Sequence, residues 1–461
     1  MIRRRTQLPL KNNERGVTMI LVVLAMLSML GIIALAIDVI TLYSARSETQ
    51  RAADAGALAA AKMLVDMGVT TADPANPSVP TAAQIDAATK AAQSVLGNLS
   101  IAGRTIQTTD VSLNFPGSGN PAFVVNPKVT VTVQNANLPT FFSRIWNRSP
   151  LTVRASATAE GFNPSNSASI TGTNAVPIIA RGVKPFLIPN CDPNPARTPS
   201  VPPPLCVGPA TATFFDPGTG DITNKGAAPT GIIGETFTLF SDCTGPGCIP
   251  GAPTTTAGSP PILKYYPVQM SLTASACPTS CLGPTTFENN IECSNPTPIS
   301  CGTTVTAPAV NQLFLDDTVL PDGHFGPAQD GVECLIHQNP GNGQDTLNPV
   351  PPLSYPLEIQ VGSNHPLSGT VLSTGDYVTT SDSLVTIAVY DETVAPDRPT
   401  SATSVKVIGF LQVFIVDAFQ GGGPQAGQFD VVVVNVSGCG NAATGTPVMA
   451  SSAVPVRLIQ Q

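Results

Sequence analysis

The sequence predicts an α+β protein. A long N-terminal transmembrane helix continues into a stem that carries a small antiparallel sheet, and a mostly-β region with disulfides follows. Three observations support this fold class. An uncharged apolar run lies near the N-terminus, an Ala-rich helical segment follows it, and strand patterns rich in Val and Thr begin near residue 128. All 10 cysteines lie after residue 190.

The apolar run spans residues 17–37, VTMILVVLAMLSMLGIIALAI. As a helix it reaches about 31 Å, which matches the hydrocarbon thickness of a bilayer. A core helix of a soluble protein rarely stays uncharged over such a length. A cleavable signal peptide, cut after Ala34-Leu35-Ala36, is the other alternative, but its apolar region is usually shorter. The positions taken to mark the membrane anchor are Val17, Leu24, Gly31 and Ile37.

Charge is distributed unevenly about this run. The segment 1–16 carries five basic residues and one acid, whereas the whole chain has a net charge of −8. The basic flank predicts that residues 1–16 are cytoplasmic and that the bulk of the chain lies across the membrane. Because the remainder is acidic and poor in Lys and Arg, nucleic-acid binding is excluded, since it needs clustered basic residues.

The segment 40–67 lacks Pro and predicts a helix that continues the anchor. Small residues recur in it at four-residue spacing, which lets another helix or a sheet approach closely. The alternative is an Ala-rich stem without a partner of its own. Gly68 is the expected C-cap, and Thr81 and Gln84 form a capping box that begins a second helix over 81–96, expected to fold back on the stem. The helix-packing positions are Ala52, Ala53, Gly56, Ala57, Ala60 and Ala61.

Alternating Val and Thr in 128–134 and the pattern of 151–159 predict half-buried strands. Between them, 138–148 predicts a short helix that groups Phe141, Phe142, Ile145 and Trp146. This apolar cluster either closes the sheet or contacts the membrane surface or a partner. Further strands are expected at 384–390, 405–416, 429–436 and 454–459, with Val431–Val434 in a central strand that is buried on both faces.

An even number of cysteines in the part of the chain predicted to lie outside the cytoplasm favours disulfides over a zinc site, because the spacings are not paired CxxC motifs and no His lies near the closely spaced pairs. The connectivity does not follow from the sequence. The close pairs Cys243/Cys248, Cys277/Cys281 and Cys293/Cys301 are the candidates for local disulfides.

Catalytic patterns are scarce, so we expect no enzyme, no cofactor and no small-molecule substrate. His324, Glu333 and His337 lie close in sequence but lack the HExxH spacing of a zinc hydrolase. Acidic residues at 216, 221, 316, 317, 322 and 330 offer oxygen ligands for calcium, but they lack EF-hand spacing, and Asp beside Pro and Gly is common turn chemistry. No metal site is predicted.

The segment ERGVTMILVVLAMLSMLGIIALAIDV, followed by RSETQRAADAGALAAAK, resembles the N-terminal module of Tad-type (Flp) pilus-assembly proteins of the TadE/TadG-like family. The matching features are the Arg-Gly junction, the apolar helix that ends in Asp38-Val39, and the signature that starts at Gln50. VTVTV, LPTFFSRIW and VRASATAE also look like the β part of that module, so the resemblance covers about residues 12–160. It implies that 38–160 is a pilin-like module, with 161–461 as a separate mostly-β region.

The resemblance also bears on processing and adhesion. Type IV prepilins, whose helix is similar, are cleaved after a Gly and carry Glu at the fifth mature position. Gly16 is therefore the candidate processing position, but Leu21 in the place of that Glu favours an uncleaved anchor. Some TadG-like proteins carry a von Willebrand factor A-like domain. The sequence lacks its Asp-x-Ser-x-Ser run, so the metal-dependent adhesion of that domain is not implied.

Together these features predict a non-enzymatic structural component of a pilus-assembly or secretion apparatus. It would be anchored in the bacterial inner membrane as a single-pass protein with its bulk in the periplasm. The expected partners are the lipid bilayer and, by resemblance, other Tad pilus-assembly proteins. The alternative is a cell-surface adhesin or binding module on a pilin-like anchor, and a cell-envelope hydrolase would depend on His324, Glu333 and His337 alone.

Overall fold

The computed structural model describes residues 14–67, 69–71, 80–120, 123, 126–138, 151–162, 178–194, 212–218, 220, 222–224, 231–241, 260–270, 285–302, 304–305, 314–315, 326–348, 358–369, 372–378, 380–391, 405–419, 427–439, 448–450 and 454–459. Its helices are α1 (Glu14–Asp66), η1 (Val69–Thr71), α2 (Ala82–Gly97), η2 (Thr108–Asp110), α4 (Thr286–Glu292) and α5 (Gly326–Leu335). Its strands are β1 (Ser100–Ile101), β2 (Arg104–Thr105), β3 (Val111–Asn114), β4 (Lys128–Leu138), β5 (Leu151–Gly161), β6 (Ile178–Ala180), β7 (Val183–Pro189), β8 (Thr236–Ser241), β9 (Ile262–Gln269), β10 (Ile299–Ser300), β11 (Thr304–Val305), β12 (Phe314–Leu315), β13 (Thr346–Asn348), β14 (Glu358–Gln360), β15 (Tyr377–Val378), β16 (Leu384–Tyr390), β17 (Val405–Ala418), β18 (Phe429–Gly438), β19 (Val448–Ala450) and β20 (Val456–Ile459).

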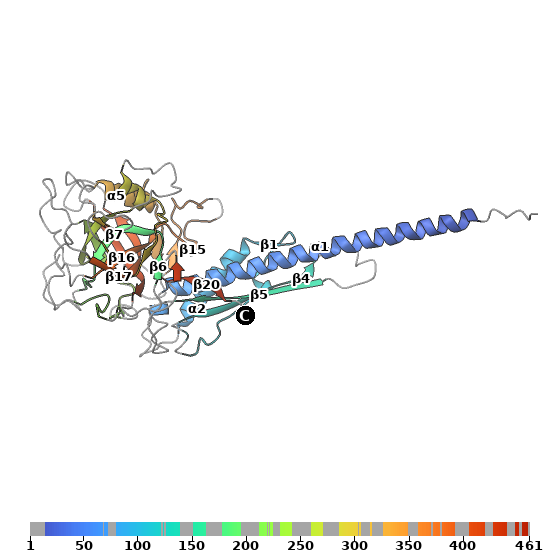
Figure 1. The fold of residues 1–461 in the computed structure, drawn as a ribbon, viewed down its shortest axis with the longest axis horizontal. Helices are drawn as coiled ribbons and strands as arrows, with labels where there is room; N and C mark the ends of the chain where they lie inside the picture. The colour runs from blue at the N-terminus through green and yellow to red at the C-terminus, as the bar shows by residue number, and fades with distance from the viewer. Residues whose placement is uncertain are drawn as a thin grey trace, which may run out of the picture.

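The helix α1 is one uninterrupted element of 53 residues, about 80 Å long. Its N-terminal half projects away from the rest of the molecule, and its C-terminal half is packed against other elements (Figure 1). This continuity confirms the long N-terminal apolar helix. Within the described part of the chain, α1 is the one helix that is long and apolar enough to cross a membrane.

A four-stranded sheet in the order β20-β5-β4-β3 lies along the C-terminal half of α1. Its strands are antiparallel, and the inward-facing Val129, Val131 and Val133 of β4 are fully buried against the helix side. The helix α2 covers another side of α1. It begins at the expected capping box, in which Thr81 Oγ1 accepts from Gln84 N and Gln84 Oε1 accepts from Thr81 N. We call α1 from residue 38 onward, α2 and this sheet the stem.

The fourth strand of the stem sheet comes from the far end of the sequence. β20 pairs antiparallel with β5, with Val456 opposite Gly161 and Ile459 opposite Thr158. The sequence predicted a strand at 454–459 but placed it in the C-terminal region. The structure brings it to the stem because β5 offers it a free backbone edge, and edge pairing carries no sequence signature of its own.

The largest sheet is built around the C-terminal strands. β17 pairs with both β16 and β18, and this closes six strands into a ring in the order β17-β16-β7-β9-β8-β18. The ring encloses a core of large side chains that includes Phe186, Phe237 and Tyr265. The run Val431–Val434 of β18 is almost fully buried, which confirms the predicted central strand. We call this ring, with α4 and α5 packed on it, the body.

Stem and body meet at the C-terminal end of α1. Asn435, a fully buried residue of β18, donates from Nδ2 to the Val65 carbonyl oxygen at 3.1 Å. Carbonyls in the last turn of a helix lack an intrahelical partner, so this side chain satisfies one of them. The expected C-cap, Gly68, lies outside the described residues.

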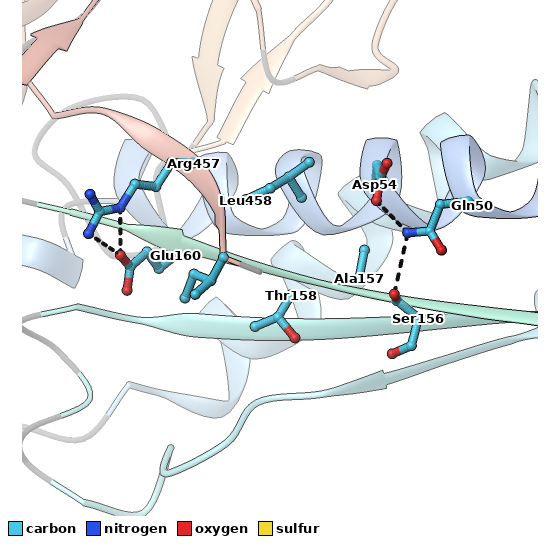
Figure 2. Close-up of a pocket in the computed structure, with 9 residues that line it drawn as sticks. Gln50, Asp54, Ser156, Ala157, Thr158, Glu160, Arg457 and Leu458 are labelled. Carbon is cyan, nitrogen blue, oxygen red and sulfur yellow. Dashed lines mark hydrogen bonds and ion pairs between the residues drawn. The ribbon is translucent and has the colours of Figure 1, made fainter. Parts of the chain in front are cut away.

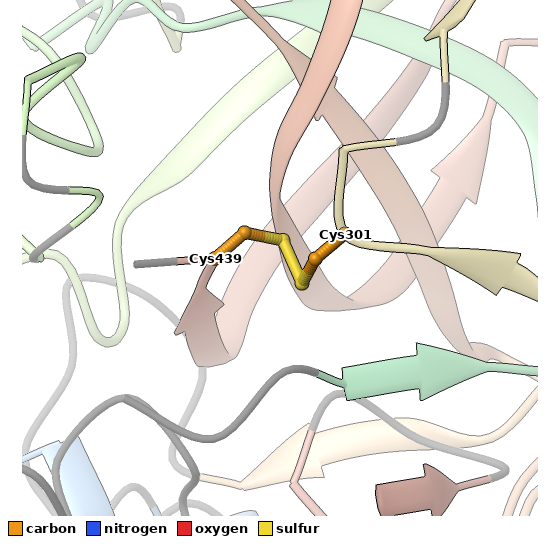
Figure 3. Close-up of a disulfide and its surroundings, with 2 residues drawn as sticks. All are labelled: Cys301 and Cys439. Carbon is orange, nitrogen blue, oxygen red and sulfur yellow. A yellow bond between two sulfur atoms is a disulfide. The ribbon is translucent and has the colours of Figure 1, made fainter. Parts of the chain in front are cut away.

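A disulfide joins Cys301, in the turn after β10, to Cys439 at the end of β18, with the two Cα atoms 5.3 Å apart (Figure 3). The predicted local pair Cys293/Cys301 is therefore wrong. The fold places Cys439 next to Cys301 although 138 residues separate them in sequence. Cys293 is itself disulfide-bonded, as are Cys191 and Cys334. The candidates that lie outside the described residues are Cys243, Cys248, Cys277 and Cys281.

Candidate interaction surfaces

The N-terminal half of α1, which holds the predicted anchor 17–37, exposes its apolar side chains on nearly all sides. The exposed fraction is 61% for Val17, 57% for Leu24 and 41% for Ile37. Gly31 and the candidate processing position Gly16 have open space around their Cα atoms. A helix that exposes this much apolar surface needs an apolar environment, which a bilayer supplies.

The small-residue rows of α1 lie inside the stem. The five alanines of these rows are at most 2% exposed, and they share one hydrophobic cluster with α2 and the inner face of the stem sheet. A Cβ on Gly56 would lie 3.0 Å from Leu96 Cδ1 and 3.3 Å from Val131 Cγ1. The rows thus let α2 and β4 of this same chain approach α1, and this face is not available to another protein.

A groove of about 900 Å³ runs beside the stem sheet (Figure 2). It is bounded by α1, by the C-terminal part of β5 from Ser156 to Glu160, and by β20. Gln50 bridges the two walls, because its amide Nε2 donates to Asp54 Oδ1 at 2.8 Å and to the Ser156 carbonyl oxygen at 3.4 Å. The residues that line the groove are Gln50, Asp54, Ser156, Ala157, Thr158, Glu160, Arg457, Leu458 and Ile459.

Arg457 of β20 forms an ion pair with Glu160 of β5. Its guanidinium lies 2.6 to 2.7 Å from Glu160 Oε1 and 4.7 Å from the centroid of the Phe162 ring. The Glu160 side chain is 7% exposed, whereas that of Arg457 is 54% exposed. An ion pair with one solvated partner is worth about 1 kcal/mol or less, and the contact with the ring adds a similar amount.

We expect Arg457→Ala to loosen β20 without unfolding the stem. The substitution leaves Glu160 buried without its cation and removes the ring contact. The free energy needed to open β20 should therefore fall by about 1 kcal/mol or slightly more. Amide exchange over 456–459 should then be about fivefold to tenfold faster. Hydrogen-exchange mass spectrometry of the full chain in detergent measures this directly. Lys128→Ala is the control, because this exposed lysine of β4 lies in register with Glu160. An equal effect of both substitutions would contradict the role of Arg457.

The residues suggested for a hydrolase are not brought together in the described part of the chain. His337 Nε2 lies 2.9 Å from Asp382 Oδ2. Glu333 instead accepts hydrogen bonds from the amides of Gln329 and Asn339. His324 lies outside the described residues, and the described residues contain no group of three or more His, Cys, Asp or Glu side chains arranged to hold a metal ion.

Two of the calcium candidates, Asp216 and Asp330, lie within the described residues. Asp216 Oδ1 accepts from Gly218 N at 2.7 Å, which is a side-chain-closed turn. Asp330, on α5, is exposed. The acids at 221, 316, 317 and 322, and the apolar cluster of Phe141, Phe142, Ile145 and Trp146, lie outside the described residues.

Two titratable groups are buried at α4, Lys184 at its C-terminal end and Glu288 on the helix itself. Lys184 of β7 donates from Nζ to the Cys293 carbonyl at 2.9 Å and to the Ile291 carbonyl, at the C-terminal end of α4. Burial lowers the pKa of this amine to about 8, although Asp382 and Glu292 act to raise it. On α4, burial raises the pKa of Glu288 to about 7, and the carboxylates of Glu292 and Asp330 raise it further.

These two pKa shifts predict a pH profile for the α4 region. The unfolded Glu288 ionises near 4.5 and the folded one near 7, so the folded state holds the extra proton between these values and stability falls as pH rises from about 4.5 to 7. For Lys184 the unfolded state holds the extra proton between about 8 and 10.5, so stability rises with pH there. Amide exchange over 286–292 should therefore be fastest between pH 7 and 8, after correction for intrinsic rates. Glu288→Gln should remove the pH dependence below pH 7 and leave the pH dependence above pH 8. An unchanged pH dependence below pH 7 would show that Glu288 is not its cause.

Comparison with known proteins finds a family match in the N-terminal part of the chain. Residues 16–63 match the model of a family described as putative Flp pilus-assembly TadE/G-like. The match covers the apolar span and the small-residue rows of α1, and it confirms the resemblance to Tad-type pilus-assembly proteins there. It indicates involvement in Flp pilus assembly. No curated protein and no solved structure matches the chain.

The sequence did not predict the groove or the side-chain contacts across it. Arg457 and Glu160 are separated by 297 residues, and Gln50 and Ser156 by 106, so no local pattern links them. The one available signal is that Arg457 interrupts an otherwise apolar strand and that Glu160 is the one acid of its own strand. A charge in such a position predicts either solvent exposure or a partner, without naming the partner.

Proposed function

We propose that this chain is a non-enzymatic, membrane-anchored structural component of a Tad/Flp-type pilus-assembly or secretion apparatus, which acts through protein–protein contacts in the periplasm. The observation that carries the proposal is α1 itself. One continuous helix is apolar and exposed in its first half and is built into a folded stem in its second half, and the Tad-like match covers both halves. Such an element holds a folded part at a set distance and orientation from a membrane.

The proposed topology places residues 1–16 in the cytoplasm, 17–37 across the inner membrane, and the stem and body in the periplasm. The basic N-terminal flank supports this orientation. Disulfide-bonded cysteines in the body support an oxidising compartment. The stem is proposed to be pilin-like, since a long helix packed on an antiparallel sheet follows the matched segment directly.

The buried contact between Asn435 and Val65 supports a structural role for the joint. A body attached to the helix end by buried contacts would move with the stem rather than swing on a linker. Partners bound to the body would then be positioned relative to the membrane. Because the small-residue rows of α1 are covered by this chain's own α2 and sheet, we propose that partner contacts use the outer surfaces of the stem and body.

The test is affinity purification of the full chain from detergent-solubilised membranes of its own bacterium, with the tag at the N-terminus, away from stem and body. We expect Tad pilus-assembly proteins to be recovered, and deletion of the gene to abolish Flp pili. In the control chain an unrelated 21-residue transmembrane helix replaces residues 17–37. Recovery of the partners with this control would assign the contacts to the stem and body. Absence of Tad components from both purifications would contradict the proposal.

Protease access separates the proposal from the cell-surface adhesin, which the size and disulfides of the body also allow. A periplasmic body is cut only after the outer membrane has been permeabilised. Cleavage of the body in intact cells, or its release into the medium, would favour the adhesin. Immunolabelling on the cell exterior supplies the same distinction.

A further inference from the structure

In the described part of the chain, one edge of the stem sheet is only partly paired. β5 extends from Leu151 to Gly161, but β20 pairs only with its last four residues, Thr158–Gly161. Over 151–157, β5 pairs with β4 on one side, and in the described part of the chain no strand pairs with the other side. An unpaired strand edge presents backbone N–H and C=O groups that another strand can use.

The groove of Figure 2 lies beside this open edge. The Ser156 carbonyl faces it, because the Gln50 amide reaches that oxygen from α1. The contact of 3.4 Å is at the long limit for a hydrogen bond, so a better-placed backbone N–H would displace it at little cost. The antiparallel pairing of β20 with the neighbouring part of β5 shows that this edge accepts a strand.

The charges of the groove indicate what kind of strand fits. Arg457 neutralises Glu160, whereas among the lining residues Asp54 accepts only from the amide of Gln50. The groove therefore carries one uncompensated carboxylate on the α1 wall. β20 also contributes apolar side chains to the groove, Leu458 and Ile459, and Leu458 is 41% exposed. Alternate side chains of an extended strand point to opposite sides, so a segment that alternates basic and apolar residues matches both features.

We propose that the open edge of β5 and this groove bind an extended segment of a partner protein, which adds a strand in line with β20 and places a Lys or Arg side chain against Asp54. This inference rests on the proposed function in that the partner would be a component of the same assembly. Backbone hydrogen bonds to the β5 edge would supply affinity, and Asp54 would supply the preference for a basic segment.

The test uses the full chain in detergent micelles and a fluorescent eight-residue peptide of alternating Lys and Val, with an alternating Glu and Val peptide for comparison. We expect the Lys peptide to bind at least tenfold more tightly than the Glu peptide. Hydrogen-exchange mass spectrometry should show slower exchange of residues 151–157 when the Lys peptide is present. That protection separates strand addition from adhesion of a cationic peptide to an acidic protein.

Two variants locate the site. Asp54→Asn should weaken binding of the Lys peptide about tenfold. Gln50→Arg places a cation in the groove at an exposed helical position, so it should weaken binding of this peptide at least as much. Asp86→Asn is the matched control, because this exposed carboxylate lies on α2, where it pairs with Lys90. Thermal unfolding checks that each variant remains folded.

Three outcomes would overturn the proposal: no preference for the Lys peptide, binding without protection of 151–157, or equal effects of Asp54→Asn and Asp86→Asn. Concentration-dependent dimers of the chain alone, with 151–157 protected in the dimer, would also overturn it, because a second copy would then occupy the edge. Failure of these peptide experiments while Tad components still copurify would remove this inference and leave the proposed function standing.

Discussion

Gly56→Leu is expected to destabilise the stem by about 3 kcal/mol. Gly56 of α1 faces both α2 and β4, and a Cβ alone would already be 3.0 Å from Leu96 Cδ1 and 3.3 Å from Val131 Cγ1. The Leu side chain has three further carbons beyond Cβ, and there is no space for them, so α2 or the sheet must move. The better helix propensity of Leu returns about 1 kcal/mol at most.

The measurement is hydrogen exchange over 82–97 and 128–138 at increasing urea concentrations, with the full chain in detergent. The unfolding midpoint of these segments should fall, while that of the body strand 429–438 stays near the wild-type value. Gly97→Leu is the matched control, because no atom lies within 4 Å of a Cβ at Gly97. Equal stability of the two variants would show that the stem is looser than this packing implies.

Replacing both Cys301 and Cys439 by Ala is expected to lower the free energy of unfolding of the body by about 4 kcal/mol. In the chain-entropy account, a cross-link that closes a loop of 138 residues stabilises by about 5 kcal/mol, and other cross-links in the body reduce this figure. Ala is chosen because Cys439 is 5% exposed and packs with apolar side chains of the body, where a hydroxyl would add a desolvation cost of its own.

Urea unfolding followed by hydrogen exchange over 405–419 and 429–438 measures this loss. The stem segments 82–97 and 128–138 provide the internal control and should keep their midpoint, because the disulfide joins the turn after β10 to the end of β18 and involves no residue of the stem. Wild-type protein treated with a reductant should lose at least as much stability, since it loses the other disulfides too. A loss below about 1 kcal/mol in the double variant would show that the fold of the body does not depend on this cross-link.

Elements with a strong local pattern were predictable from the sequence. The uncharged run and the Ala-rich segment predicted a helix that continues past residue 60, and α1 ends at Asp66. Thr81 and Gln84 predicted the start of α2, because a capping box satisfies two orphan N–H groups within four residues. Alternating Val in 128–134 predicted which face of β4 is buried.

The candidate surfaces were less predictable, because each depends on pairing between distant residues. The Cys293/Cys301 pair was inferred from proximity along the chain, but disulfide geometry depends on distance in space, and the body brings Cys439 to Cys301. The small-residue rows predicted close packing without naming the partner. The structure fills them with α2 and the stem sheet of the same chain.

The sequence by itself determined the uncharged apolar span, the continuous helix and the strand-forming segments, because hydrophobic period, capping and uncharged length are local properties of the chain. Only the tertiary structure decided that β20 joins β5 in the stem, that Arg457 pairs with Glu160, and that no strand among the described residues pairs with the outer edge of β5 over 151–157. The physical reason is that backbone edges are nearly alike in every strand, so which edges meet depends on how the whole chain packs.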